Sequence, residues 1–219
     1  MKTFTYALLF FLLLFTACTA PHEKVSVDYT TYVNPFIGTD FTGNTYPGAQ
    51  APFGMVQLSP DNGLPGWDRI SGYFYPDSTI AGFSHTHLSG TGAGDLYDIS
   101  FMPVTLPYKE AEAPLGIHSR FSHDDESATA GYYQVLLKDY NINVELTATE
   151  RCGIQRYTFP EAQAAIFLNL KKAMNWDFTN DSRIEIVDSV TIQGYRFSDG
   201  WARDRKSTRL NSSHRTISY

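Results

Sequence analysis

The sequence predicts an all-β fold, an antiparallel β-sandwich, from three observations. In residues 142–147, apolar and polar side chains alternate so that Ile142, Val144 and Leu146 share one side, as in a half-buried strand. Other short strand-like runs follow one another with turns between them, and no stretch has a helical period. Aromatic residues make up 15% of the chain and favour strands over helices. Successive strands joined by short turns are typical of a sandwich or barrel.

The strands are expected in two regions. Between residues 32 and 102, glycine and proline are dense enough to break helices and to build loops between short strands. From Gly131 onward the pattern is plainly β, with turns at residues 138–141, 160–161 and 188–189. The expected strands are 55–58, 99–104, 132–137, 142–147, 156–159, 165–170, 184–187 and 190–197.

The N-terminus has the features of a secretion signal. Lys2 precedes an apolar run at residues 7–15, which is too short to span a bilayer. The small residues before Cys18 are typical of a bacterial lipoprotein processing site, so residues 1–20 are interpreted as a lipoprotein signal peptide with Cys18 lipidated. The protein would then be secreted and membrane-anchored, in the periplasm or on the cell surface. The alternative is an ordinary signal peptide cleaved near Ala20.

The chain contains two cysteines, Cys18 and Cys152. If Cys18 carries lipid, no disulfide framework remains. Cys152 lies in a strand-like stretch without a neighbouring His or Asp, so we expect a small buried apolar side chain rather than a nucleophile.

The two ends of the chain flank one predicted domain. Residues 21–31 read as a polar linker, and residues 32–205 as the sandwich domain. Residues 206–219 are polar and basic, with no strand alternation that suits what precedes them. We interpret this tail as non-native sequence and expect the natural protein to continue beyond residue 204; a natural flexible C-terminus is the alternative.

The composition limits the kinds of partner. Hydrophobic residues make up 42% of the 219 residues and charged residues only 18%, which is enough for a real core and excludes a disordered acidic tail. The net charge of −6 argues against nucleic-acid binding, because a polyphosphate needs a basic face. The charge is neutral evidence about a sugar partner.

The most informative segment is residues 32–103. It contains in order the phrases NPFIGT (34–39), PGA (47–49), PFGMVQ (52–57), GY (72–73) and GFSHTHLSG (82–90). Each phrase alone is weak, but their order and spacing together resemble the N-terminal domain of glycoside hydrolase family 92. The resemblance extends over about residues 32–204.

The resemblance implies a function for a longer protein. Members of the family are mainly calcium-dependent, inverting exo-α-mannosidases that join an N-terminal β-sandwich to a larger (α/α)6 catalytic domain. Inversion needs a carboxylic acid and a carboxylate base with room for water between them. The resemblance places these groups and most calcium ligands in the C-terminal domain, so this segment is expected to hold no catalytic residue and no metal. It would complete a pocket for mannose-containing glycans.

The candidate sugar-binding residues are an aromatic ring and polar groups near glycines. Trp67 and Asp68 follow Gly63 and Gly66, and a ring beside a carboxylate suits the C–H face and hydroxyls of a sugar. The alternative is a Trp that anchors a loop while Asp68 caps a turn. The resemblance adds further pocket candidates, namely Tyr73, His85, His87, Ser89 and Gly90.

Three other motifs are set aside. His85 and His87 could share one face of an extended segment, but no third metal ligand has a recognisable spacing. Residues 89–95 are rich in glycine but lack the lysine and spacing of a phosphate loop. Residues 123–126 are acidic without calcium-loop spacing, so a solvated loop is the simpler interpretation.

The sequence therefore predicts the pocket-completing domain of a secreted α-mannosidase, inactive as this fragment. One alternative is a free-standing lipoprotein that binds glycans through the Trp67 region without hydrolysing them. Another is a structural surface domain without a ligand. The partners expected from the first interpretation are the C-terminal catalytic domain, mannose-containing glycans and, through Cys18, the membrane.

Overall fold

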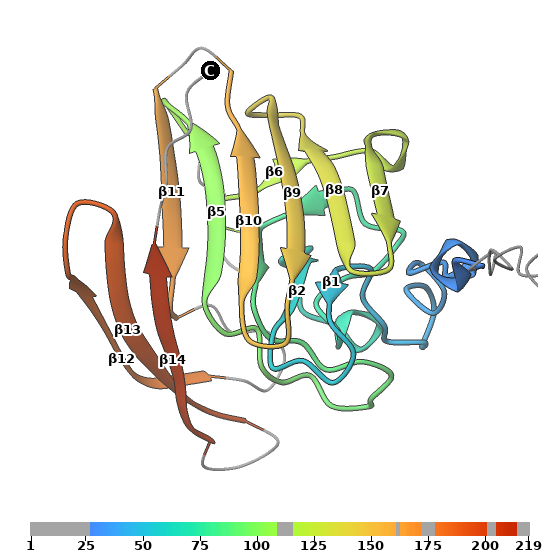
Figure 1. The fold of residues 1–219 in the computed structure, drawn as a ribbon, viewed down its shortest axis with the longest axis horizontal. Coiled ribbons are helices and arrows are strands. Elements are labelled where there is room, and N and C mark those ends of the chain that lie inside the picture. The colour runs from blue at the N-terminus through green and yellow to red at the C-terminus, as the bar shows by residue number, and fades with distance from the viewer. Residues whose placement is uncertain (1–26, 109–115, 161–162, 172–177, 201–204, 214–219) are drawn as a thin grey trace, which may run out of the picture.

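A computed structural model describes residues 27–108, 116–160, 163–171, 178–200 and, as backbone only, 205–213. The described chain is all-β, with strands and three short 3-10 helices, and every strand pairing is antiparallel (Figure 1). The fold class predicted from the sequence is confirmed. The predicted signal peptide, with Cys18, lies outside the described residues.

Two sheets form the sandwich. One has the order β1-β2-β4-β5-β11 and the other the order β10-β9-β8-β7. The strands of the first are Ala49–Gln50 (β1), Gln57–Asp61 (β2), Gly82–Ser84 (β4), Ser100–Thr105 (β5) and Ala164–Asn169 (β11). Those of the second are Glu126–Thr129 (β7), Tyr132–Leu137 (β8), Ile142–Ala148 (β9) and Gly153–Thr158 (β10). β11 returns to pair with β5, so the first sheet depends on residues from both halves of the chain.

The core lies between these two sheets. The alternation predicted for residues 142–147 is confirmed, because Ile142, Val144 and Leu146 are buried and the side chains between them are not. These side chains pack in one cluster with Leu58 of β2 and Phe83 of β4. The strand expected at residues 55–58 begins later, since the Met55 N–H donates to the Glu150 carbonyl at 2.7 Å instead of joining the sheet.

A third sheet lies to one side of the sandwich, beside β11 and β5 (Figure 1). Its strands are Phe178–Ile186 (β12), Thr191–Asp199 (β13) and Arg205–Ser213 (β14), in that order. The strand pair expected around residues 188–189 is therefore present. β14 differs from the expectation, because residues that lack strand alternation nevertheless pair with β13 from Thr191 to Ser198. The foreign origin of the tail stays a prediction.

The remaining elements are short. β3 (Thr79–Ile80) pairs with β6 (Ser119–Arg120), and the 3-10 helices are η1 (Tyr29–Tyr32), η2 (Trp67–Arg69) and η3 (His123–Asp125). η1 overlaps the end of the predicted linker and is exposed. Among the described residues, no helix is long and apolar enough to cross a membrane.

The prediction from the sequence that Cys152 is buried is wrong. Cys152 is exposed, because it lies in the tight connection between β9 and β10 rather than in a strand. Its N–H donates to Thr149 Oγ1 at 3.1 Å, and its carbonyl accepts from the Thr149 N–H at 2.8 Å. The turn therefore directs the thiol to solvent.

Candidate functional site

Two loops carry the candidate residues, and both are hydrogen-bonded to a third loop. We call residues 38–46, 66–75 and 85–99 together the loop end of the sandwich. The Gly90 N–H donates to the Asn44 carbonyl at 2.6 Å, and Ser71 Oγ donates to the Thr45 carbonyl at 2.8 Å. The first loop therefore links the segment after Trp67 to the Ser89–Gly90 turn.

Trp67 and Asp68 lie on η2 at the surface. The Trp67 residue is 58% exposed, and Asp68 is half-buried. Arg69 holds the far side of this short helix, because its Nε donates to Asp77 Oδ2 at 2.6 Å and its guanidinium lies 4.7 Å from the centre of the Phe74 ring. The hydrogen bond to Asp77 raises the pKa of Arg69, and the charge of Asp68 acts in the same direction. An exposed ring beside a carboxylate is therefore presented on a fixed support.

Ser89 and Gly90 form an exposed turn on the third loop. Gly90 has a φ of +66°, which favours glycine, yet a Cβ added there would meet no atom within 4 Å. The space beside this turn is open. A ligand could thus approach its backbone closely.

His85 is half-buried behind the same loop and makes hydrogen bonds within the protein. Its Nδ1 donates to the Ile99 carbonyl at 2.9 Å, and its ring meets the Phe101 ring edge to face, with centroids 5.4 Å apart. Desolvation by burial lowers the pKa of His85, and the nearby His87 lowers it further. The ring is therefore held in its neutral form at neutral pH.

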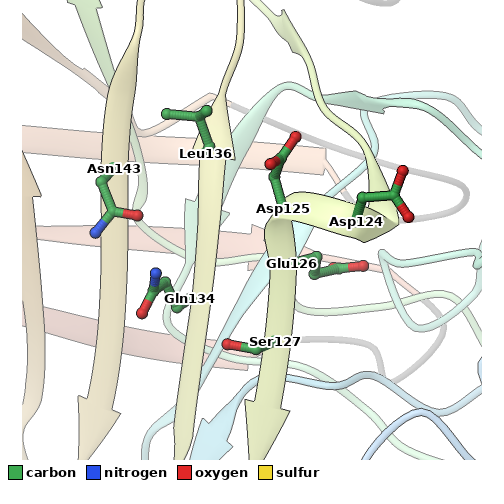
Figure 2. A pocket seen from close by; sticks show the side chains of 7 residues that line it. All are labelled: Asp124, Asp125, Glu126, Ser127, Gln134, Leu136 and Asn143. Atoms are coloured by element: carbon green, nitrogen blue, oxygen red, sulfur yellow. The ribbon is translucent and has the colours of Figure 1, made fainter.

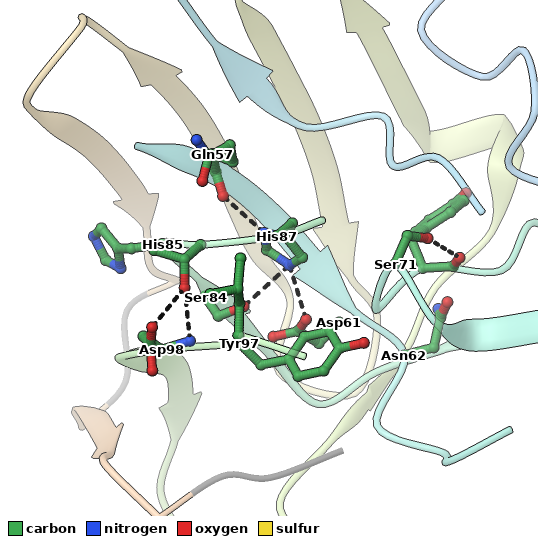
Figure 3. Close-up of polar contacts among 12 residues, drawn as sticks. Gln57, Asp61, Asn62, Ser71, Ser84, His85, His87, Tyr97 and Asp98 are labelled. Atoms are coloured by element: carbon green, nitrogen blue, oxygen red, sulfur yellow. Dashed lines mark hydrogen bonds and ion pairs between the residues drawn. The ribbon is translucent and has the colours of Figure 1, made fainter. Parts of the chain in front are cut away.

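His87 lies inside the domain and its side chain is completely buried. Its Nδ1 is 2.7 Å from the Gln57 carbonyl oxygen, and its Nε2 is 3.0 Å from Asp61 Oδ1 (Figure 3). A carbonyl only accepts hydrogen bonds, so Nδ1 donates to Gln57. His87 Nε2 and Asp61 Oδ1 lie at ion-pair distance within the core.

Ser84, His87 and Asp61 do not form a hydrolytic triad. Ser84 Oγ lies 3.0 Å from His87 Nε2, the same nitrogen that meets Asp61. In a triad the serine and the carboxylate bond to opposite nitrogens of the ring. All three side chains are also buried, so this cluster has a structural role.

Tyr73 is buried as well and donates to a buried carboxylate. Its hydroxyl is 2.9 Å from Glu126 Oε2, and the Tyr133 hydroxyl is 2.6 Å from Glu126 Oε1. Burial and the charge of Glu126 raise the pKa of both phenols, so they stay protonated as donors. His123 Nδ1 lies 2.7 Å from Glu126 Oε2. Part of the acidic segment expected as a solvated loop is therefore a buried anchor.

Apart from His85, which is half-buried, the predicted site residues divide into two groups. Trp67, Asp68, Ser89 and Gly90 lie at the surface of the loop end, whereas Tyr73 and His87 lie in the interior. The polar atoms of Tyr73 and His87 are hydrogen-bonded within the protein. We therefore assign these two residues a structural role, in which they support the loops.

Sequence reasoning missed one residue at the surface of the loop end. Phe41 is 80% exposed and has a φ of +49°, an uncommon conformation for a bulky residue. The close approach of Gly43 to Gly38 forces this turn, because a Cβ on Gly43 would lie 2.3 Å from the Gly38 carbonyl oxygen. In the sequence, the spacing of Gly38 and Gly43 is the feature that could have indicated this turn.

The acidic segment borders a shallow hollow on the outward face of β7, β8 and β9. The hollow has a volume of about 400 Å³, and Figure 2 shows Ser127, Gln134 and Asn143 on its three strands. None of the predicted site residues lines it.

Calcium is the metal implied by the resemblance. Among the described residues, no group of three or more His, Cys, Asp or Glu side chains is arranged to hold a metal ion. The donor set present does not fit a calcium site, so we derive no step through calcium in this domain.

The fold and the loop end define an antiparallel β-sandwich that presents an aromatic ring, a carboxylate and a glycine turn from one end. The chain matches the model of the glycosyl hydrolase family 92 N-terminal domain over residues 32–213, and it belongs to this family. The matched range includes β14.

Solved structures of family members share the fold. A family 92 α-mannosidase of Bacteroides thetaiotaomicron, solved with mannoimidazole, is 42% identical and superposes with a TM-score of 0.79 over 84% of this chain and 25% of its own. The family 92 glycosyl hydrolase ccman5 is 29% identical, with a TM-score of 0.69 over 84% of this chain and 26% of its own. The chain thus spans about a quarter of the length of these relatives.

One curated relative comes from a fungus. An uncharacterized secreted glycosidase of Arthroderma benhamiae is 28% identical over 144 residues, which are 63% of this chain and 18% of that protein. Its name describes that protein as a secreted glycosidase.

Proposed function

We propose that this chain is the N-terminal, pocket-completing domain of a secreted, calcium-dependent, inverting exo-α-mannosidase that removes mannose from glycans. The observation that carries the proposal is the exposed Trp67 ring beside the half-buried Asp68 on the loop end of a family 92 N-terminal sandwich. The 42% identity to an α-mannosidase solved with mannoimidazole supports mannose as the sugar.

The loop end can contribute binding but not bond cleavage in this proposal. Trp67 offers its ring to the apolar face of a sugar, and Asp68 can accept hydrogen bonds from sugar hydroxyls. The open space beside Gly90 would allow the ligand to approach the backbone of this turn. The acid, the base and the calcium ion would come from the C-terminal catalytic domain, with which the loop end would form the pocket.

The test uses the longer enzyme that contains this domain. Asp68→Ala is expected to lower kcat/KM on a mannobioside by about ten-fold to a few hundred-fold, because a buried charged hydrogen bond is worth roughly 1.5–3 kcal/mol. Trp67→Ala should act in the same direction. Near-native kcat/KM in both folded variants would show that these residues only shape a loop.

Two further measurements test the rest of the proposal. The 219-residue chain without its signal should show no turnover of an activated α-mannoside, and chelator-sensitive turnover would contradict this. The longer enzyme should lose activity with chelator and release β-mannose first, as seen by proton NMR.

The proposal includes a lipid anchor at Cys18. Cys18→Ser should release the protein from the membrane fraction of cells, because one thiol carries the attachment. Unchanged membrane association of Cys18→Ser would show that the segment is an ordinary signal peptide.

A further inference from the structure

The residues that directly follow η2 rest on the buried Asp61–His87 ion pair. Gly72 has a φ of +89°, and a Cβ added to it would lie 2.6 Å from Asp61 Oδ1 and 3.1 Å from His87 Cδ2. Its own N–H donates to the Arg69 carbonyl at 3.0 Å, which closes the end of η2. The backbone after Trp67–Arg69 therefore sits against the ion pair with no space between them.

Tyr97 makes a second connection from the ion pair to the same segment. Its ring meets the His87 ring edge to face, at 6.0 Å between centroids and an interplanar angle of 81°. Its hydroxyl donates to the carbonyl of Ile70, the residue immediately after η2. His87 thus contacts the support of η2 both through Gly72 and through Tyr97.

The ion pair fixes the orientation of the imidazole ring. The ring has partners at both nitrogens, namely the Gln57 carbonyl on one side and Asp61 with Ser84 on the other. Hydrogen bonds are directional, so bonds at both nitrogens hold the ring in one orientation. Gly72 and Tyr97 consequently meet a surface of fixed shape.

We propose that Asp61 and His87 are positioning residues that set the place of Trp67 and Asp68 without touching the ligand. The effect on sugar binding rests on the proposed function, whereas the effect on Trp67 does not. A small displacement of a binding group can cost a large factor in rate. Asp61 and His87 would therefore affect sugar binding by setting the position of Trp67 and Asp68.

The first test follows Trp67 in the 219-residue chain. Trp176→Phe and Trp201→Phe leave Trp67 as the single tryptophan. In this background, His87→Gln and Asp61→Asn are expected to change acrylamide quenching of Trp67 about two-fold, because η2 loses its fixed support. Asp61→Asn keeps the shape of the side chain and provides a second variant if His87→Gln does not fold.

The matched control is Val144→Ala, a fully buried core residue of β9. It lowers stability by removing apolar volume but leaves the ion pair intact. Val144→Ala should leave Trp67 quenching unchanged at a comparable loss of unfolding free energy. Equal quenching in all three variants would overturn the positioning proposal, because loss of stability alone would then explain the data.

The second test uses the longer enzyme and separates the two proposals. His87→Gln is expected to lower kcat/KM on a mannobioside about ten-fold, whereas Val144→Ala stays within about two-fold of wild type. If Trp67→Ala and Asp68→Ala lower kcat/KM but His87→Gln does not, the positioning proposal is overturned. Native activity in Trp67→Ala and Asp68→Ala would instead overturn the proposed site, and the quenching result would still decide whether the pair positions η2.

Discussion

Arg196 on β13 forms a buried ion pair with Asp98, which lies 98 residues earlier in the chain, in the loop before β5. Arg196 Nε also donates to the Leu170 carbonyl at 3.0 Å and to Thr179 Oγ1 at 2.9 Å. On the other side, Asp98 Oδ2 accepts from Thr86 Oγ1 at 3.0 Å. One guanidinium therefore joins the third sheet to the loop end of the sandwich.

Replacing Arg196 by Met should lower the free energy of unfolding by about 3–5 kcal/mol, because the Asp98 carboxylate would stay buried without its cation. Urea unfolding measures the change. Asp98→Asn in the same protein should recover part of the loss, since the uncompensated charge is then removed. A loss below about 1 kcal/mol for Arg196→Met would contradict a buried, energetically coupled pair.

Gly72→Ala and Gly90→Ala test the fit of the loop against the ion pair. Both glycines have positive φ, so alanine costs about 1–2 kcal/mol at either position. Only at Gly72 would the new methyl group also collide with Asp61, which adds about 1–3 kcal/mol of overpacking. Denaturant unfolding should therefore show a clearly larger loss for Gly72→Ala. Equal losses would mean that the segment moves away from Asp61 at little cost.

The pH dependence of stability should contain a contribution from His85. Its pKa is lower in the folded protein, chiefly because burial disfavours the charged ring, so the unfolded chain binds more protons below the ordinary histidine pKa of about 6.5. Stability is fully present above that pH and falls as the pH drops through the folded-state pKa. His85→Gln should flatten the curve below about pH 6.5. A curve of unchanged slope in His85→Gln would assign the pH dependence to other groups.

Deletion of residues 206–219 tests the tail. β14 is an edge strand, and β13 keeps its pairing with β12 when β14 is removed. The freed backbone groups of β13 can bond to water, so we expect the Tm to change by less than about 4 °C, equivalent to roughly 1 kcal/mol for a domain of this size. A larger fall would show that the tail packs on the domain as a native strand.

The sequence predicted the fold where the signal is local. β9 alternates apolar and polar residues, and its buried positions follow directly from this pattern. β8 was predicted as a strand, but its sequence does not show which side chains are buried. β1, β3 and β6 were missed because a strand of two residues has no period to detect. β14 was missed because its pairing comes from the register with β13 rather than from its own composition.

The candidate site was only partly predictable for the same reason. The Trp67–Asp68 pair stands out as an aromatic and acidic dipeptide after two glycines, which is a local feature. The burial of His87 depends on Asp61, 26 residues earlier, and that of Glu126 on Tyr73, 53 residues earlier. Partners so far apart in the sequence have no spacing signature. His87 was therefore predicted as a sugar-binding candidate and Glu126 as part of a solvated loop, although both stabilise the interior.

The long-range pairing of β5 with β11 has a consequence for how the protein is made. All three loops of the loop end are complete by residue 99, but β5 receives its second neighbour only from residues 164–169. Leu58 and Phe83 likewise wait for the side chains of β8 and β9. During synthesis from the N-terminus, the growing chain exposes Leu58, Phe83 and the open edge of β5 until these later strands are made, a state prone to aggregation. The candidate site therefore reaches its folded form late, although its residues are synthesised early.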